Sequence, residues 1–259
     1  MLDSLYIGAT GMQAQQTNVD MIANNLANVN TSAFKRGQVT FEDMMYRDVL
    51  RTAASDQAGD PIQRIGVGVS ISNTGKIFTQ GDVKQTDVPF DVAIQGQGFF
   101  EVTLPDGSLG YTRNGHFQIN RDGYLVTADG YPLKTPIQIP PDTKEILIQP
   151  NGLVSVTLPN ESNPVEIGQL NLSTFANPAG LTARGNNLYT SSNASGEPVS
   201  HRPGEAGLGV LQQGFLESSN VKLVEEMINL IMAQRAYEIN SKVIQASDEM
   251  LGMSNNLRR

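Results

Sequence analysis

Two glycine-rich stretches and two histidines are the residue types that most directly suggest chemistry. Residues 66–68 read Gly-Val-Gly and residues 96–98 read Gly-Gln-Gly, a spacing found in nucleotide-binding loops. Neither stretch opens a predicted helix or completes a Walker or Rossmann pattern, so we interpret both as strand glycines. His116 stands beside a predicted hairpin turn without a nucleophile or acid next to it. His201 stands next to Arg202 and Pro203 in a glycine-rich segment, which predicts an exposed loop.

Four acidic residues form the next candidate for chemistry: Asp82, Asp87, Asp91 and Glu101. Glycosidases use a pair of carboxylates on either side of the scissile bond. Spacing in the sequence does not say which carboxylates meet in space, and acidic surface residues are common in a chain with 26 of them. We therefore predict no catalytic residue, no cofactor and no metal site.

Composition excludes several classes of function. The 259 residues include 18 basic and 26 acidic ones, a formal net charge of −8, which argues against nucleic-acid binding and against docking on anionic lipid. The absence of cysteine excludes disulfides and thiolate sites, and two histidines leave no histidine-rich metal site. No apolar run approaches the roughly 18 residues of a membrane helix. Asp3 stands where a secretory signal carries positive charge, so we expect no cleaved signal peptide.

Both ends of the chain show a heptad pattern. At the N-terminus the repeating positions are Leu2, Leu5, Ala9, Met12, Gln16, Val19, Ala23 and Leu26, which predicts a helix over about residues 3–30. Gly8 and Gly11 each cost this helix about 1 kcal/mol relative to alanine. Four asparagines between residues 24 and 30 also disfavour it. The helix must therefore gain its stability from packing.

The C-terminal pattern runs through Met232, Ala236, Ile239, Val243, Ala246, Met250, Met253 and Leu257. It predicts a helix that begins near Val221, with Asn220 as its N-cap. Two such helices are expected to pack on each other. An ordinary two-helix element on a globular domain is one interpretation. The other is that identical subunits supply further helices, because one pair alone makes a thin core.

The middle of the chain predicts β structure. Asx-Gly dipeptides at residues 106, 114, 122, 129 and 151 favour tight hairpin turns with positive φ at both central residues. Strands are predicted at 98–104, 109–113, 116–120, 124–128, 137–139, 145–149, 154–158 and 165–175, and residues 176–215 predict loops with short strands. The fold class is α+β: N- and C-terminal helices packed as a coiled-coil layer, with a mainly antiparallel β central domain. We assign residues 1–35 and 216–259 to a helical domain, 36–66 to an extended, partly helical connector, and 67–215 to a β-rich domain.

Three stretches resemble the bacterial flagellar rod and hook protein family. Residues 23–35 (ANNLANVNTSAFK) resemble its N-terminal motif and residues 234–242 (QRAYEINSK) its C-terminal motif. Residues 91–100 (DVAIQGQGFF), followed by YTRNG at 111–115, resemble the opening of its central β-domain. The family usually has glycine where this chain has Ala33, and alanine is strained there if φ is positive.

The resemblance implies a structural subunit, without cofactor, that polymerises into a hollow helical tube. The terminal helices would form its inner layer, and the connector would stiffen it into a drive shaft. Implied partners are copies of itself, proximal rod and hook-side axial proteins, the surrounding bushing rings and the flagellar export apparatus, with neither nucleic acid nor membrane insertion. The implied location is the periplasm-spanning rod of the basal body, reached without a cleaved signal.

The assembly interface is predicted to use residues from both terminal motifs and heptads. They are Leu5, Met12, Val19, Asn24, Asn25, Leu26, Asn28, Phe34, Gln234, Arg235, Tyr237, Ile239, Asn240 and Val243. Two alternatives remain open. One is a different axial subunit, of the proximal rod or the hook. The other is a cell-wall-acting enzyme, since a rod must cross peptidoglycan, and it would need a carboxylate pair or a metal site in the β region.

Overall fold

The computed structural model describes residues 2–48, 64–159 and 163–256, and the chain forms two compact units. The helical unit contains residues 1–27, 37–75 and 222–259, and the β unit contains residues 28–36 and 76–221. The chain therefore passes between the units four times, after residues 27, 36, 75 and 221.

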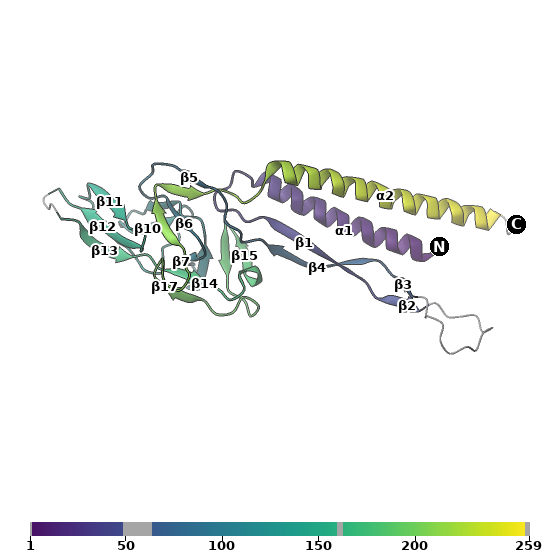
Figure 1. Ribbon diagram of the computed structural model, residues 1–259, viewed down its shortest axis with the longest axis horizontal. Coiled ribbons are helices and arrows are strands. Elements are labelled where there is room, and N and C mark those ends of the chain that lie inside the picture. The colour runs from purple at the N-terminus through teal and green to yellow at the C-terminus, as the bar shows by residue number, and fades with distance from the viewer. Residues whose placement is uncertain (1, 49–63, 160–162, 257–259) are drawn as a thin grey trace. The chain divides into compact units, whose positions relative to one another are not determined.

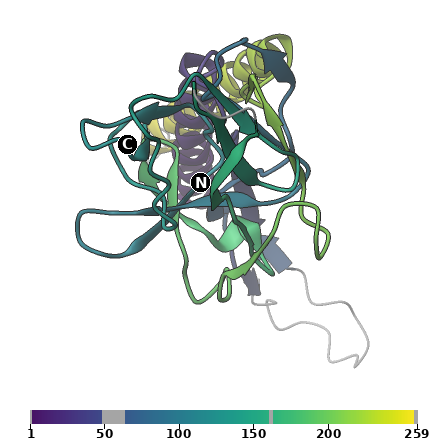
Figure 2. The ribbon, with the colours of Figure 1, turned by 90° about the vertical axis from the view of Figure 1, so that its left-hand side faces the viewer.

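Two long helices form most of the helical unit: α1 (Leu2–Ala27) and α2 (Leu223–Asn256). They lie side by side in both views (Figure 1; Figure 2). The prediction of a helix at each end is confirmed, although α1 stops before the predicted residue 30. A turn replaces its last residues: the Thr31 amide donates to the Asn28 carbonyl at 3.1 Å, and Thr31 Oγ1 donates to Asn28 Oδ1 at 3.2 Å. Across the described residues, neither helix is both long and apolar enough to cross a membrane.

The predicted connector is β structure wherever it is described. β1 (Gly37–Asp43) pairs with β4 (Val69–Lys76), and β2 (Tyr46–Asp48) pairs with β3 (Arg64–Gly66) in antiparallel orientation. Its partly helical character is not found there, because buried Gly37 and Val39 alternate with exposed neighbours at the period of a strand. Residues 37–75 also group with the helices and residues 28–36 with the β unit. Residues 49–63 lie outside the described part of the chain.

The β unit contains the remaining strands, which confirm the prediction of a mainly antiparallel β region. They are β5 (Val83–Gln85), β6 (Val92–Gln95), β7 (Phe99–Thr103), β8 (Leu109–Thr112), β9 (Phe117–Ile119), β10 (Leu125–Thr127), β11 (Glu145–Ile148), β12 (Leu153–Thr157), β13 (Val165–Gln169), β14 (Leu172–Thr174), β15 (Thr182–Gly185), β16 (Leu188–Thr190), β17 (Val199–His201), β18 (Val210–Gln213) and β19 (Phe215–Glu217). The largest sheet has six strands in the order β15-β16-β8-β7-β14-β17, and another has the order β11-β12-β13. Pairs β9–β10, β6–β18 and β5–β19 complete the β unit.

Two strand predictions differ from the structure. Residues 137–139 form no strand, and Gln138 makes only an isolated bridge to Tyr124. The predicted strand over 165–175 is two strands in different sheets, β13 and β14. Leu170, which lies between them, is buried, and its amide donates to the Gly152 carbonyl at 2.8 Å. A stretch that predicts one strand thus contains a change of sheet.

The turns follow the predicted glycines but not the predicted geometry. Gly107, Gly123, Gly130 and Gly152 have positive φ, whereas the aspartate or asparagine before each does not. Gly115 has ordinary φ and is needed for space instead, because a Cβ there would lie 1.7 Å from the Val92 carbonyl oxygen. The tight turn with two positive φ values is at Asn186 and Asn187, between β15 and β16, in a segment predicted as loop.

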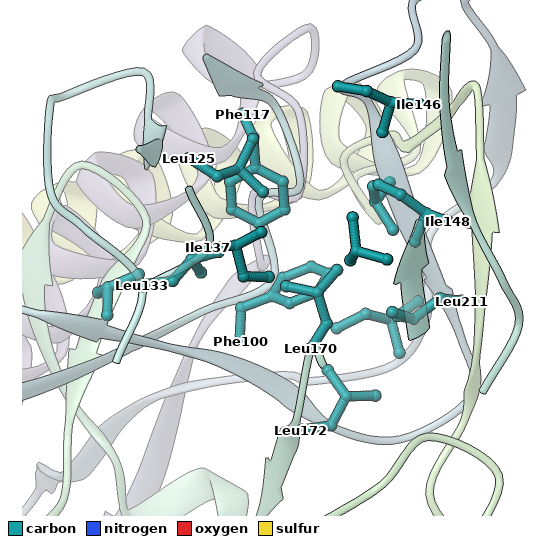
Figure 3. Close-up of a cluster of buried hydrophobic side chains, with 14 of the residues drawn as sticks. Phe100, Phe117, Leu125, Leu133, Ile137, Ile146, Ile148, Leu170, Leu172 and Leu211 are labelled. Carbon is teal, nitrogen blue, oxygen red and sulfur yellow. The ribbon is translucent and has the colours of Figure 1, made fainter. Parts of the chain in front are cut away.

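The core of the β unit lies between its sheets. Phe100 and Phe117 meet edge to face, with ring centroids 5.0 Å apart. Aliphatic side chains from β11, β14, β18 and the loops surround them (Figure 3), and Phe100, Ile137 and Leu172 are fully buried. A second aromatic cluster contains Phe99, Tyr111 and Tyr189. The β unit therefore has a complete hydrophobic core of its own.

Candidate assembly surface

α1 contacts α2 through small and polar side chains. A Cβ on Gly8 would lie 2.8 Å from Cγ1 of Ile244, and one on Gly11 would lie 2.8 Å from Nδ2 of Asn240. The two glycines that weaken α1 as a helix therefore provide the space in which α2 lies. The buried positions of the two helices are mostly small or polar residues: Gly8, Ala14, Ile22 and Asn25 on α1, and Glu226, Ala233 and Ser247 on α2.

Asn25 is the polar centre of the helical unit. Its Nδ2 donates to the Gly37 carbonyl at 2.9 Å and to Oε2 of Glu226 at 3.3 Å, and its Oδ1 accepts from the Gly37 amide at 2.8 Å. The side chain thereby joins α1, α2 and β1. Gly37 needs to be small, since a Cβ there would collide with the Met21 sulfur.

The predicted heptad stripes are not the contact between the two helices. On α1, Leu5, Met12, Val19 and Leu26 are only partly buried, and Ala9, Gln16 and Ala23 are exposed. On α2, Met232, Ile239 and Met253 are 65%, 61% and 59% exposed. The two helices do pack on each other within one chain, as predicted, but these heptad positions do not make the contact. The closest contact uses the glycine face instead, because only that face lets the two helix backbones approach.

α2 carries many exposed large apolar side chains, on more than one of its faces, which are together called here the α2 stripe. Its members are Leu223, Val224, Met227, Ile228, Ile231, Met232, Tyr237, Ile239, Val243, Met250 and Met253. Isolated exposed apolar residues are ordinary, but their concentration on one helix indicates an interaction surface. The predicted interface contained only Tyr237, Ile239 and Val243 of this set. The other members could have been predicted from the many apolar residues over 223–232, which lie on more than one face of the helix.

The structure divides the other predicted interface residues into accessible and enclosed ones. Asn24 and Gln234 are exposed, and Arg235 is exposed with an ion pair to Glu238 at 3.2 Å. Asn28 and Asn240 are half-buried. Asn25 and Phe34 are buried within the chain and have internal partners, including Lys76, whose Nζ lies 4.2 Å from the Phe34 ring centroid.

Two expectations about the ends of α1 and α2 have definite outcomes. Ala33 has φ of 58° and is 1% exposed, so the position that usually carries glycine does require the left-handed region. Asn220 is not the N-cap of α2. Its Oδ1 accepts from the Arg36 amide at 2.7 Å, and its Nδ2 donates to the Ile77 carbonyl at 2.8 Å. The side chain is used to join distant segments.

The residues considered first for chemistry have structural partners. Arg113 donates to the carbonyls of Gly96 and Gly98, each at 2.9 Å, so these glycines form an arginine-binding turn between β6 and β7. His116 Nδ1 lies 2.6 Å from buried Asp91, which also accepts from Thr86 Oγ1. His201 is exposed, but it ends strand β17 and does not lie in a loop.

The four acids do not come together as one catalytic pair. Asp91 is bound to His116, Glu101 is bound to Lys134 at 3.0 Å, and Asp87 accepts from Gln85. Asp82 contributes its carbonyl to the Ser218 amide. Within the described residues, no cluster of three or more acids or histidines could hold a metal ion.

Comparison with known proteins gives the same family from both ends of the chain and its middle. Residues 5–35 match the flagella basal body rod protein model, residues 93–156 the flagellar hook protein FlgE/F/G D1 domain, and residues 212–257 the flagellar basal body rod FlgEFG protein C-terminal model.

Several relatives carry the name flagellar basal-body rod protein FlgG, among them those of three bacteria. That of Buchnera aphidicola subsp. Schizaphis graminum is 48% identical over 97% of this chain and 98% of its own. Those of Borreliella burgdorferi and Bacillus subtilis are 47% and 40% identical over the whole of both chains. The chain therefore belongs to the FlgG family of flagellar basal-body rod proteins, structural subunits of the distal rod in the flagellar basal body.

Proposed function

We propose that this chain polymerises with copies of itself into a rigid hollow helical drive shaft, in which the α2 stripe and the partly exposed α1 heptad form the inner packed layer. The observation that carries the proposal is the α2 stripe, with Val224, Met232 and Ile239 each more than half exposed. Burying one large apolar side chain contributes about 1.5–3 kcal/mol. Association of a non-self-complementary surface in a rotation that does not close produces an open helical filament.

The specific contacts of the rod are part of the same proposal. Its axial neighbours are the proximal rod proteins on one side and hook-side proteins on the other, and bushing rings surround it. The chain reaches this position through the flagellar export apparatus. It acts by assembly and torque transmission, with no catalytic role, no cofactor, no nucleic-acid partner and no insertion in the membrane.

Substitutions in the α2 stripe test the interface. Ile228→Ser and Ile239→Ser replace side chains that are 52% and 61% exposed, so we expect each variant to fold and to stop rod assembly, measured by electron microscopy of isolated basal bodies. Leu147→Ser is the matched control, since Leu147 is 50% exposed on β11 of the β unit. Normal rods from both α2 variants would contradict the proposal.

A deletion tests the stiffening role of the connector. Residues 50–62 lie outside the described part of the chain, between the paired Asp48 and Arg64 of β2 and β3. Their removal, with Val49→Asn and Gln63→Gly, leaves a two-residue Asn-Gly connection suited to a hairpin. We expect the shortened chain to be exported and to polymerise into tubes that bend. Tubes as straight as those of the parent chain, measured as curvature in electron micrographs, would place stiffness in the helices alone.

A muramidase assay distinguishes the structural subunit from a cell-wall-acting enzyme. Purified full-length protein is incubated with isolated peptidoglycan, and release of soluble fragments is followed over time. We expect no release above buffer, because Asp91 and Glu101 are engaged in separate internal pairs. Fragment release that Asp91→Asn or Glu101→Gln abolishes would overturn the structural assignment.

A further inference from the structure

Glu217 lies at the centre of a buried ionic cluster in the β unit. Its Oε1 accepts from Nζ of Lys35 at 2.6 Å and from the Gly81 amide at 2.8 Å, and its Oε2 accepts from Nε of Arg113 at 2.8 Å. The side chains of Glu217 and Lys35 are fully buried, and that of Arg113 is 3% exposed. One carboxylate thus faces two cations without solvent to screen them.

Each member of the cluster comes from a different part of the chain. Lys35 also donates to the Thr79 carbonyl at 2.7 Å, and Arg113 fixes the carbonyls of Gly96 and Gly98. Burial lowers the pKa of Lys35, and Glu217 opposes that shift by favouring the charged form. A buried charge of this kind persists only where its partner is held in place.

Backbone hydrogen bonds extend the cluster across three segments, 33–36, 77–82 and 217–220. The Ala33 amide donates to the Glu217 carbonyl at 2.8 Å, and the Ser218 amide donates to the Asp82 carbonyl at 2.7 Å. The Ile77 amide donates to the Arg36 carbonyl at 2.9 Å, and Asn220 bonds to the first two segments through its side chain.

These three segments belong to the stretches through which the chain enters and leaves the β unit. The chain crosses between units after residues 27, 36, 75 and 221, and the three segments lie next to the last three of these points. The first crossing continues directly into the 28–36 stretch that Lys35 anchors. A β unit with its own hydrophobic core does not need the segments next to these crossing points to bind a single carboxylate, that of Glu217.

We propose that Glu217 is a positioning residue that clasps the three segments to the β unit, so that torque carried by a rod subunit enters the β unit through this one point. The clasp, defined as Lys35, Arg113, Glu217 and Asn220, makes the three segments move with the β unit as one body. The torque clause rests on the proposed function, whereas the clasp itself is a property of the single chain.

The test is hydrogen exchange of the full-length monomer carrying Glu217→Gln. A glutamine offers one acceptor oxygen where three donors converge, and it turns an amide N–H toward a cation. We expect exchange at the amides of Ala33, Gly81, Ser218 and Asn220 to accelerate about tenfold or more relative to the paired amides of β7 and β8. Equal acceleration everywhere, or none at the clasp, would overturn the proposal.

A matched control separates clasping from general stability. Glu101→Gln removes another buried carboxylate of the β unit, which bonds to Ser173, Ser200 and Lys134 and to none of the three segments. We expect Glu101→Gln to leave the exchange rates at the amides of Ala33, Gly81, Ser218 and Asn220 unchanged relative to those of β7 and β8. If Glu217→Gln does not fold, Lys35→Met removes one arm while the Arg113–Glu217 pair remains. Its expected effect is faster exchange at Ala33 and Gly81, and unchanged exchange there would overturn the clasp.

Swimming under load tests the torque clause separately. Cells with Glu217→Gln are expected to lose speed in viscous medium more than cells with Glu101→Gln, at equal rod number. Equal swimming speeds, together with faster exchange at the amides of Ala33, Gly81, Ser218 and Asn220, would support the clasp but contradict its role in transmitting torque. If the unsubstituted chain forms no rods, the proposed function is contradicted. The exchange result on the monomer would still decide whether the clasp exists.

Discussion

The large apolar side chains of the two units have opposite surroundings. In the β unit Phe100 and Leu172 are fully buried, whereas on α2 of the helical unit Val224 and Met232 are 69% and 65% exposed. The β unit closes its sheets over a hydrophobic core, and the helical unit uses small and polar residues where its helices meet. One unit is thus complete within a single chain, and the other has its apolar surface directed outward.

This difference explains a combination that is otherwise costly. Glycine within a helix and asparagine in its contact face both reduce the stability of α1. The same residues create a close, polar fit to α2 and leave the apolar positions free. The helical unit is therefore expected to reach full stability only when other helices cover the α2 stripe.

The largest effect is expected from the core of the β unit. Phe100→Ala removes a fully buried ring that packs on Phe117, and we expect a loss of about 3–5 kcal/mol in the free energy of unfolding. Denaturant unfolding followed by tyrosine fluorescence measures it. Ile231→Ala on α2 is the comparison, and we expect it to change monomer stability by less than about 0.5 kcal/mol, because its side chain is exposed. Similar losses for both would erase the distinction between the units.

The next effect concerns Asn25 in the helical unit. Asn25→Leu leaves the amide and carbonyl of Gly37 without their partner, which costs about 1–3 kcal/mol for each buried group left unsatisfied. We expect irregular or aggregated polymers while the β unit keeps its unfolding midpoint. Asn193→Leu is the control, since Asn193 is exposed in the β unit and lies outside the predicted assembly interface. Straight, regular rods from Asn25→Leu would show that its hydrogen bonds are dispensable.

A smaller and opposite pair of effects is expected at the glycines of α1. Alanine is better than glycine in a helix by about 1 kcal/mol, so Gly8→Ala and Gly11→Ala should both raise the helicity of the free chain in circular dichroism. In the assembled state they should differ. At Gly11 the obstacle is the mobile end of Asn240, whereas at Gly8 it is Cγ1 of Ile244 near the backbone. We therefore expect Gly8→Ala to impair rod assembly more than Gly11→Ala. Impaired assembly with Gly11→Ala but not with Gly8→Ala would contradict this expectation.

The smallest effect is expected at Ala33. Because Ala33 has φ of 58°, Ala33→Gly should stabilise the β unit by about 0.5–1 kcal/mol, less the methyl group that it removes from a buried site. Thermal unfolding of the purified chain measures the shift in Tm. A lower Tm would mean that burial of the methyl group outweighs the strain.

Periodicity predicted what is local in this molecule. The helices at both ends and the hairpin strands between residues 98 and 128 follow from spacing and residue type, whereas the strain at Ala33 was predicted from the resemblance to the family. The choice of helix face could not be predicted in the same way. An apolar heptad favours contact with some helix, but whether that helix belongs to the same chain depends on how closely Gly8 and Gly11 let α2 approach.

Long-range partners were equally invisible to the sequence. Asn220 has the residue type of an N-cap but joins Arg36 and Ile77, because three segments distant in sequence converge there. The stretch from 165 to 175 reads as one strand, yet its two halves lie in different sheets. Local propensity does not encode which strand will be the neighbour.

Hydrogen exchange of the dilute monomer tests most directly whether one unit is complete and the other is not. We expect the amides of α1 and α2 to exchange rapidly. Those of β7 and β8 should be protected and exchange only when the whole β unit unfolds. Assembly into rods should then protect both helices. Strong protection of α1 and α2 in the monomer, equal to that of β7 and β8, would contradict the account.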